Sequence, residues 1–285
     1  MPTEPSDAPT VGETDASRST PRSTRLSQID ADGATEGRSA TAERRRRRRP
    51  ARDWREGGST VRRWGYDLLG WTMLSFGAGI LGSSALSTLA PTLGGGLVAP
   101  LVMWAGMLVP IVLAFSRSRP RMLLRFRWVD VLYGVVLGGA LRIVQGWLDV
   151  AAGASGAFPS YPTVNGALTP DWWFTEALTP VIIGPTIEEL FFRGVLLVTI
   201  FTVVRRAFGK GFAAFIALVV TTGVFVLAHG ISGAIGWDDA VVFTLVGLVA
   251  GLLVLLTGRI WGALLVHIVF NGTYVLLALT GTLLA

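Results

Sequence analysis

The sequence predicts an all-α, polytopic transmembrane helical bundle of about seven spans, preceded by a disordered N-terminal tail. Three observations predict this fold. Hydrophobic residues make up 51% of the 285 residues and the mean hydropathy is +0.54, an apolar content above that of ordinary soluble domains. Apolar stretches long enough to cross a bilayer core recur from residue 66 onward. Lys and Arg are confined to alternate loops between these stretches, as the positive-inside rule requires.

Residues 1–64 are expected to form the disordered basic cytoplasmic tail, and residues 65–285 the transmembrane helical domain. The tail is rich in Ser, Thr, Pro and Arg and has few large apolar side chains, so it cannot bury enough surface to offset its chain entropy. It does not open with the apolar segment of a cleavable secretory signal. An uninterrupted arginine run from Arg44 to Arg49 lies close to the first span. Anionic headgroups attract such basic residues with about 1 kcal/mol each, so the expected partner of the tail is anionic lipid, and nucleic acid is not expected.

The membrane domain divides into apolar stretches of the length that a helix needs to cross a bilayer of about 30 Å. Tryptophans, which favour the headgroup region, lie at or near many of the span ends: Trp64, Trp128, Trp172, Trp173, Trp237 and Trp261. The expected spans lie near residues 66–90, 97–116, 129–151, 176–204, 211–234, 240–257 and 260–283.

The loop charges predict the orientation of these spans, because short cytoplasmic loops concentrate Lys and Arg. Loops 91–96, 153–175 and 235–239 contain no Lys or Arg, and the last two of them contain Asp. The basic residues of the other loops are Arg62, Arg63, Arg117, Arg119, Arg121, Arg125, Arg127, Arg205, Arg206, Lys210 and Arg259. We therefore expect a multi-pass protein of the plasma membrane with a cytoplasmic N-terminus and an external C-terminus.

Ionisable residues inside the spans are the candidates for function, because each is costly in a membrane unless it is paired or hydrated. Arg142 and Asp149 are about two turns apart on one face of the third span, which favours an architectural role. The absence of cysteine excludes disulfides, thiol nucleophiles and Cys-ligated metals. The remaining ionisable residues away from the span ends are Glu188, Glu189, Arg193, His229 and His267.

The two glutamates of the fourth span have different surroundings. Glu189 precedes Arg193 by four residues, the favourable order for an ion pair on one helix face. Glu188 points roughly 100° away from Glu189 around the helix and has no partner in this pattern. An unpaired carboxylate in an apolar site suits a general base that takes a proton from water.

Both histidines lie inside spans. His229 follows Phe225 by four residues, so the two rings share a helix face. His267 precedes Asn271 by four residues, so these two polar side chains also share a face. A single buried histidine is more often packing than chemistry, but two in spans, one of them beside an asparagine, indicate a site.

One carboxylate, two imidazoles and a carboxamide can activate water and stabilise a tetrahedral oxyanion, which indicates hydrolysis of an amide. Glu188, His229 and His267 could also hold a divalent metal such as zinc, which would lower the pKa of bound water. The residues alone leave both routes open.

In this order, Glu188-Glu189-x-x-x-Arg193, Phe225-x-x-x-His229 and His267-x-x-x-Asn271 resemble the three motifs of the CPBP family, the CAAX-processing and bacteriocin-processing (Abi) intramembrane proteases. The resemblance covers about residues 172–275. It implies that Glu188 activates the attacking water, with Glu189 and Arg193 in support. His229 would assist or ligate, and His267 with Asn271 would stabilise the oxyanion or hold a metal. The implied substrate is a membrane-associated protein or peptide.

The sequence can also be compared with the motifs of other membrane-protein functions. The chain has no H-E-x-x-H zinc-protease motif. Ser155 lies in a Gly-Ala-Ser-Gly sequence that is similar to the nucleophile motif of rhomboid proteases, but the His-x-x-x-Asn pair follows it and the order is reversed. A transport protein could use the same ionisable residues as a proton relay. A bacteriocin-immunity protein could act without proteolysis.

The topology places Glu188 near mid-membrane and His229 nearer the outer face, a difference in depth of roughly 10 Å at 1.5 Å per residue. Pro180, Gly184 and Pro185 can break the fourth helix and close this gap. The predicted site is therefore reached from the external half of the membrane.

Overall fold

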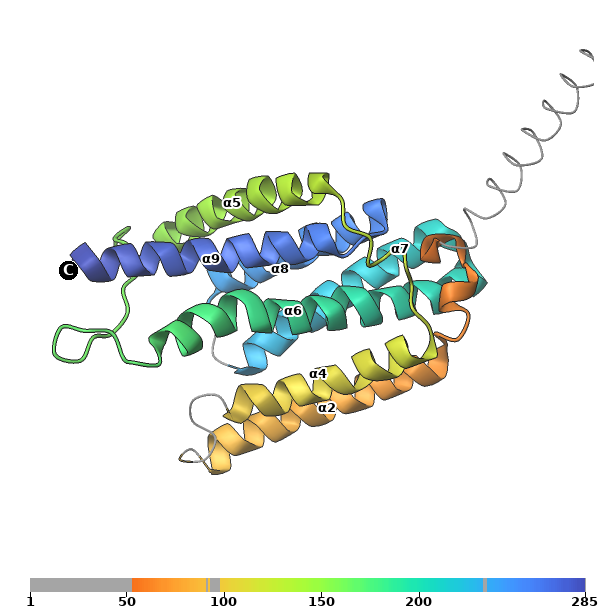
Figure 1. The fold of residues 1–285 in the computed structure, drawn as a ribbon, viewed down its shortest axis with the longest axis horizontal. Coiled ribbons are helices and arrows are strands. Elements are labelled where there is room, and N and C mark those ends of the chain that lie inside the picture. The colour runs from red at the N-terminus through yellow and green to blue at the C-terminus, as the bar shows by residue number, and fades with distance from the viewer. Residues whose placement is uncertain (1–52, 91, 93–97, 233–234, 285) are drawn as a thin grey trace, which may run out of the picture. The chain divides into compact units, whose positions relative to one another are not determined.

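In the computed structural model of the chain, the described residues are 53–90, 92, 98–232 and 235–284, and all of their named elements are helices (Figure 1). The all-α prediction is therefore confirmed. The expected disorder of residues 1–52 lies outside the described residues. In chain order the elements are η1 (Trp54–Glu56), η2 (Ser59–Val61), α2 (Tyr66–Leu89), α4 (Val98–Arg117), α5 (Trp128–Ala151), η3 (Trp173–Ile183), α6 (Gly184–Glu189), η4 (Leu190–Leu196), α7 (Leu197–Ser232), α8 (Trp237–Thr257) and α9 (Trp261–Leu284).

Within the described residues, six helical runs are long and apolar enough to cross a membrane, where the sequence indicated about seven spans. The difference arises in the run Trp173–Ile231, whose 59 residues include both the fourth and the fifth expected spans. Gly209 interrupts this run inside α7 with φ 79° and ψ 176°. A positive φ suits glycine, which has no Cβ to clash. The kink therefore divides the run into two helical arms. This is the arrangement expected for two spans joined by a tight connection.

The long helices pack in pairs, α2 against α4 and α5 against α9 (Figure 1). The first pair meets at Gly79 and Gly106. A Cβ added to Gly106 would lie 2.6 Å from the backbone oxygen of Ser75 and 2.8 Å from the Cα of Gly79. The hydroxyl of Ser75 also donates to the Gly106 carbonyl at 3.0 Å. Small residues thus let the two backbones meet, as is typical of helices that associate in membranes.

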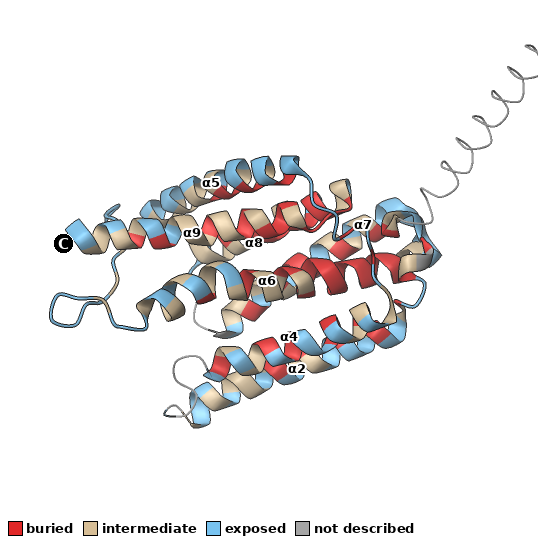
Figure 2. Cartoon of the chain, in the orientation of Figure 1, coloured by how far each residue is buried: buried red, intermediate tan, exposed pale blue. Residues whose placement is uncertain are grey.

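The most buried part of the described chain is η4 and the first turn of α7 (Figure 2). Phe191 and Phe192 are fully buried there, and their ring centroids lie 4.9 Å apart. Phe76 of α2 packs on Phe191 at 4.7 Å, and Phe225 of α7 packs on Phe192 at 5.2 Å. This aromatic core fixes the helix segment that carries Glu189 immediately before it.

The prediction that residues 1–64 form a disordered tail is wrong for residues 53–64, because this segment folds against the membrane domain. Trp54, Val61 and Trp64 are buried. The indole N–H of Trp54 donates to the Gly258 carbonyl just after α8 at 3.1 Å. Arg55 donates through Nη1 to the Leu255 carbonyl near the same helix end at 3.1 Å. The composition of this segment gave no sign of burial, because its few large apolar residues are isolated tryptophans rather than a periodic stripe.

Replacing Trp54 by alanine is expected to lower the free energy of unfolding by about 3–5 kcal/mol. Its indole is fully buried and packs edge-on against Phe201 of α7, with ring centroids 5.2 Å apart. The loss should appear as a lower unfolding temperature of the purified protein in detergent. Trp54→Phe is the matched control, since it keeps an aromatic ring and removes the hydrogen bond, which is worth about 1 kcal/mol. Wild-type stability in Trp54→Ala would show that the segment does not support the fold.

Candidate active site

Glu188 and Glu189 end a short α-helical turn, α6, which lies between the π-helical segments η3 and η4. Pro180 inside η3 has no backbone N–H, and Pro185 occupies the first turn of α6. π-helical turns are wider than α-helical turns and often mark functional sites. They change the direction of the side chains along this span relative to a regular α-helix.

Gly184 lets Glu188 lie close to two other helices. A Cβ added to Gly184 would lie 3.4 Å from Cζ2 of Trp104 on α4 and 3.3 Å from the Thr179 carbonyl of η3. It would lie 3.6 Å from Oε1 of Glu188. The Glu188 side chain keeps 13% of its surface exposed, so it faces an opening and not the packed core.

Glu189 and Arg193 form the ion pair that their spacing predicted. Nη1 of Arg193 lies 2.8 Å from Oε1 of Glu189, and the two side chains are 1% and 0% exposed. The guanidinium also lies over the Phe225 ring, with Cζ 4.6 Å from the ring centroid. Its Nη2 donates to the Gly247 carbonyl of α8 at 3.5 Å. The pair is therefore fully withdrawn from solvent, where a lone charge would be very costly.

His267 of α9 lies between the two glutamates. Its Nδ1 is 3.1 Å from Oε1 of Glu189, and its Nε2 is 3.9 Å from Oε2 of Glu188. A carboxylate paired with Arg193 can only accept a hydrogen bond, so Nδ1 carries the proton and donates it to Glu189. Nε2 is left to face Glu188. The sequence did not predict that Glu189 would orient His267.

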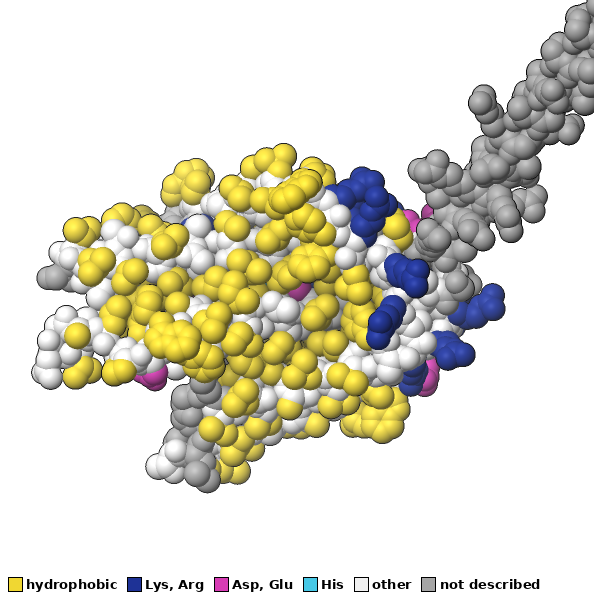
Figure 3. All heavy atoms as spheres, in the orientation of Figure 1, with side chains coloured by type: hydrophobic (Ala, Val, Ile, Leu, Met, Phe, Trp, Pro, Cys, Tyr) yellow, Lys and Arg dark blue, Asp and Glu magenta, His cyan; other side chains and the backbone are white. Residues whose placement is uncertain are grey.

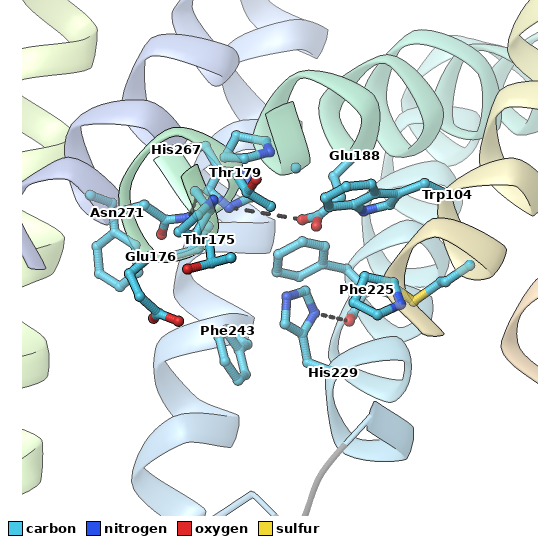
Figure 4. A pocket seen from close by; sticks show the side chains of 17 residues that line it. Trp104, Thr175, Glu176, Thr179, Glu188, Phe225, His229, Phe243, His267 and Asn271 are labelled. Atoms are coloured by element: carbon cyan, nitrogen blue, oxygen red, sulfur yellow. Dashed lines mark hydrogen bonds and ion pairs between the residues drawn. The ribbon is translucent and has the colours of Figure 1, made fainter. Parts of the chain in front are cut away.

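His229 of α7 is held by its own helix and by two aromatic rings. Its Nδ1 donates to the Phe225 carbonyl at 2.9 Å, since a carbonyl oxygen can only accept. The imidazole centroid lies 4.4 Å from the ring centroid of Phe225 and 4.4 Å from that of Phe243 on α8. Figure 4 shows the imidazole beside Phe225, with the bond to the carbonyl drawn.

Asn271 ties α9 to the π-helical segment η3. Its Nδ2 donates to the Pro180 carbonyl at 2.7 Å. A carboxamide nitrogen carries two hydrogens, so one hydrogen remains for another acceptor. The proline that breaks the regular helix therefore also provides the acceptor that orients Asn271.

A cavity of about 500 Å³ brings four of the six predicted site residues together, namely Glu188, His229, His267 and Asn271 (Figure 4). Glu189 and Arg193 do not line this cavity and lie behind His267 in the core. Glu188 and His229 line the same cavity, so the difference in depth expected from regular helices does not keep them out of one site.

Several residues of this cavity were missed by the sequence reasoning. The missed residues are Pro100, Met103 and Trp104 of α4, Thr175, Glu176, Thr179 and Pro180 of η3, Gly184 and Pro185 of α6, Phe243 and Val246 of α8, and Phe270 of α9. Only Glu176 carried a signal that could have found it, because it is an ionisable residue at the first position of the expected fourth span. The apolar residues resemble every other core position in an apolar helix.

Glu188, His229 and His267, which the sequence left open as possible metal ligands, are not gathered around one point in the described chain. No three His, Asp or Glu side chains of the described chain are grouped so that they could bind one ion. Two ligand atoms with bonds of about 2 Å to a tetrahedral zinc lie roughly 3.3 Å from each other, somewhat closer than Glu188 Oε2 and His267 Nε2, which are 3.9 Å apart.

Arg142 and Asp149 lie apart from this cavity, as the architectural interpretation suggested. Arg142 donates through Nη2 to the Phe270 carbonyl of α9 at 2.6 Å and through Nη1 to Gln145. Asp149 lines a second cavity of about 650 Å³ with Arg142, Asp238 and Asp239. Ser155, the rhomboid-like candidate, is exposed in the loop after α5 and lines neither cavity.

Residues 170–273 match the family model described as type II CAAX prenyl endopeptidase, Rce1-like. This match confirms the resemblance to the CPBP and CAAX protease family, and the matched range contains all six predicted site residues. At the level of the family, the function is that of a CAAX-type intramembrane protease in a multi-pass membrane protein. No curated protein and no solved structure matches the chain.

Proposed function

We propose that this chain, with its CAAX-type protease region, is an endopeptidase that hydrolyses a peptide bond inside the membrane with a water molecule activated by Glu188. One observation carries the proposal. A partly exposed carboxylate, two histidines and an asparagine line a single cavity of about 500 Å³ within a bundle of apolar helices. These are the groups that amide hydrolysis needs, namely a base, proton carriers and an oxyanion donor.

The gap between Glu188 and His267 suggests where the attacking water is held. At 3.9 Å, Oε2 of Glu188 and Nε2 of His267 are too far apart for a direct hydrogen bond, and one water can bond to both. Because Nδ1 of His267 donates to Glu189, the neutral ring presents an acceptor at Nε2. Such a water donates one hydrogen to each group and keeps a lone pair for attack on the carbonyl carbon.

The reaction then follows from the donors and acceptors of the cavity. Glu188 takes the proton as the water oxygen bonds to the carbonyl carbon. The second carboxamide hydrogen of Asn271 stabilises the oxyanion, while His229, whose N–H is held by the Phe225 carbonyl, presents an acceptor nitrogen to the cavity. When the C–N bond breaks, Glu188 returns the proton to the leaving nitrogen, and the products are a carboxylic acid, which then ionises by giving its proton to solvent, and an amine.

We place the protein in the plasma membrane with its basic end on the cytoplasmic side. The Lys and Arg side chains in view in Figure 3 gather at one end of the described chain, next to a broad apolar belt. This is the distribution that the positive-inside rule describes. The expected contact of the Arg-rich tail with anionic lipid belongs to the same proposal, although the run Arg44 to Arg49 lies outside the described residues.

The test is proteolysis by the purified full chain in detergent, with lipidated CAAX peptides and apolar membrane peptides as substrates and mass spectrometry of the products. We expect cleavage to continue in excess EDTA, because the described side chains do not converge as metal ligands. A Glu188→Ala protein is the negative control. Loss of cleavage with EDTA and its recovery with Zn²⁺ would replace the proposed route by a metal-dependent one.

Transport and bacteriocin immunity are the alternatives to proteolysis. A transporter would move protons or ions across vesicles that contain the purified protein, and this flux would depend on Glu188. An immunity protein would keep its protective phenotype in cells when Glu188 is replaced. Absence of cleavage of every peptide, together with either result, would remove the protease assignment for this chain.

A further inference from the structure

The cavity that contains Glu188 has an acidic lining. It includes two carboxylates, Glu176 and Glu188, and its described lining residues include no Lys or Arg. Two imidazoles complete the titratable groups of the cavity. A substrate segment that enters it therefore meets negative charge without a compensating cation.

Glu176 has the position of a residue that meets substrate first. It lies in the first turn of η3, it is exposed, and it makes no hydrogen bond or ion pair with a described residue. Figure 4 shows Glu176 on the side of the cavity formed by Thr175 and Asn271, with Glu188 on the opposite side. A segment between the two walls would pass the Glu176 carboxylate on its way to Glu188.

The charged residues at the start of η3 and of α8 add to the negative charge of Glu176. Asp171 precedes η3, and Asp238 and Asp239 begin α8. Segments 152–172 and 235–239 contain no Lys or Arg. Arg142, which lines the second cavity, has its guanidinium engaged with the Phe270 carbonyl and Gln145. Like charges that face each other are costly and opposite charges attract, so this end selects against acidic segments.

We propose that Glu176 is a specificity-determining residue that selects peptide segments carrying Lys or Arg close to the scissile bond. This inference rests on the proposed function of the same cavity. An acidic side chain close to the bond would face two carboxylates and bind poorly. Among the described residues, no hydrogen bond or ion pair joins Glu176 to Glu188 or His267, so its role lies in selecting the substrate and not in the chemistry.

The inference can be tested by binding, which separates recognition from cleavage. The probes are three fluorescent peptides of about 20 apolar residues, the length of a membrane span, followed by Ser-Lys, Ser-Gln or Ser-Glu. They are titrated with the full-length Glu188→Gln protein in detergent at low salt, which preserves charge interactions. The Lys peptide should bind about tenfold more tightly than the Glu peptide, because attraction in one case and repulsion in the other add.

Two further substitutions in the Glu188→Gln background identify the responsible residue. Glu176→Gln should bring the three affinities close together, and Glu176→Lys should reverse their order. Asp171→Asn is the matched control, because Asp171 is a nearby carboxylate outside the cavity, and it should keep the preference for Lys. A preference that Glu176→Lys leaves unchanged, or a wild-type order that favours the Glu peptide, would overturn the inference.

The outcomes for recognition and for chemistry are distinguishable. If cleavage by the Glu188-containing protein depends on Glu188 but the Glu176 variants show no change in charge preference, only the inference about Glu176 fails. If the peptides sort by charge through Glu176 but the Glu188-containing protein cleaves none of them, the proposed function fails and Glu176 remains a binding residue.

Discussion

Glu188→Gln is expected to lower the rate of peptide hydrolysis by about 10³-fold, within the range that a general base contributes. Glutamine keeps the size of the side chain and a hydrogen-bond acceptor, but its amide cannot take the proton from water. The change should appear in kcat and leave KM close to wild type, because the substrate still fills the same cavity. The measurement is the initial rate of product formation by the purified protein under saturating peptide.

Stability measurements separate this loss from misfolding. Glu188 is partly exposed and makes no direct hydrogen bond with a described residue, so the unfolding temperature of Glu188→Gln should stay near wild type. Glu188→Asp keeps the carboxylate but withdraws it from the water position, and it should retain more activity than the glutamine variant. Undiminished hydrolysis by Glu188→Gln would show that another group activates the water.

The sequence predicted those features that depend on local spacing or on hydropathy. The spans follow from apolar length, and the ion pair of Glu189 with Arg193 follows from their separation of four residues. The shared face of His267 and Asn271 follows in the same way, since both line one cavity. These relations hold because they require only a helix and neighbouring turns.

The contacts between distant helices could not be predicted in the same way. Glu189 bonds to His267 across 78 positions of sequence, and nothing near either residue indicates that pairing. Trp104 reaches the cavity from α4 because Gly184 leaves room beside it. The π-helical turns on either side of α6 depart from an ideal α-helix, so the contacts of this span with α9 do not follow from regular helical spacing.

The segment 53–64 shows a different limit of sequence reasoning. Its burial depends on Trp54, which packs on α7 and bonds to the end of α8, and on Trp64, which packs on Phe115 of α4. A composition average over a polar, arginine-rich tail hides these two residues. Average composition describes a tail well only where no single large side chain has a partner surface. Here Trp54 has such a surface, which extends the folded unit toward the N-terminus.

Removal of either partner of the buried ion pair is expected to have the largest effect on stability. Glu189→Ala leaves the Arg193 guanidinium, 1% exposed, without its counter-charge. Breaking a buried pair in this way costs about 3–5 kcal/mol, because an uncompensated charge remains in the core. The same variant removes the acceptor of His267 Nδ1, so hydrolysis should also fall. Thermal unfolding in detergent and the initial rate of hydrolysis measure the two effects.

A double variant separates charge from orientation. Glu189→Leu with Arg193→Met replaces the pair by apolar side chains of similar size, a change that is often neutral or stabilising. We expect it to recover most of the lost stability but not the activity, since the leucine cannot hold the proton-bearing nitrogen of His267. Glu56→Gln, which breaks the exposed pair with Lys210, is the matched control and should cost less than about 1 kcal/mol. Full activity in a stable double variant would mean that Glu189 serves the fold alone, and that His267 keeps its orientation through its other contacts in α9.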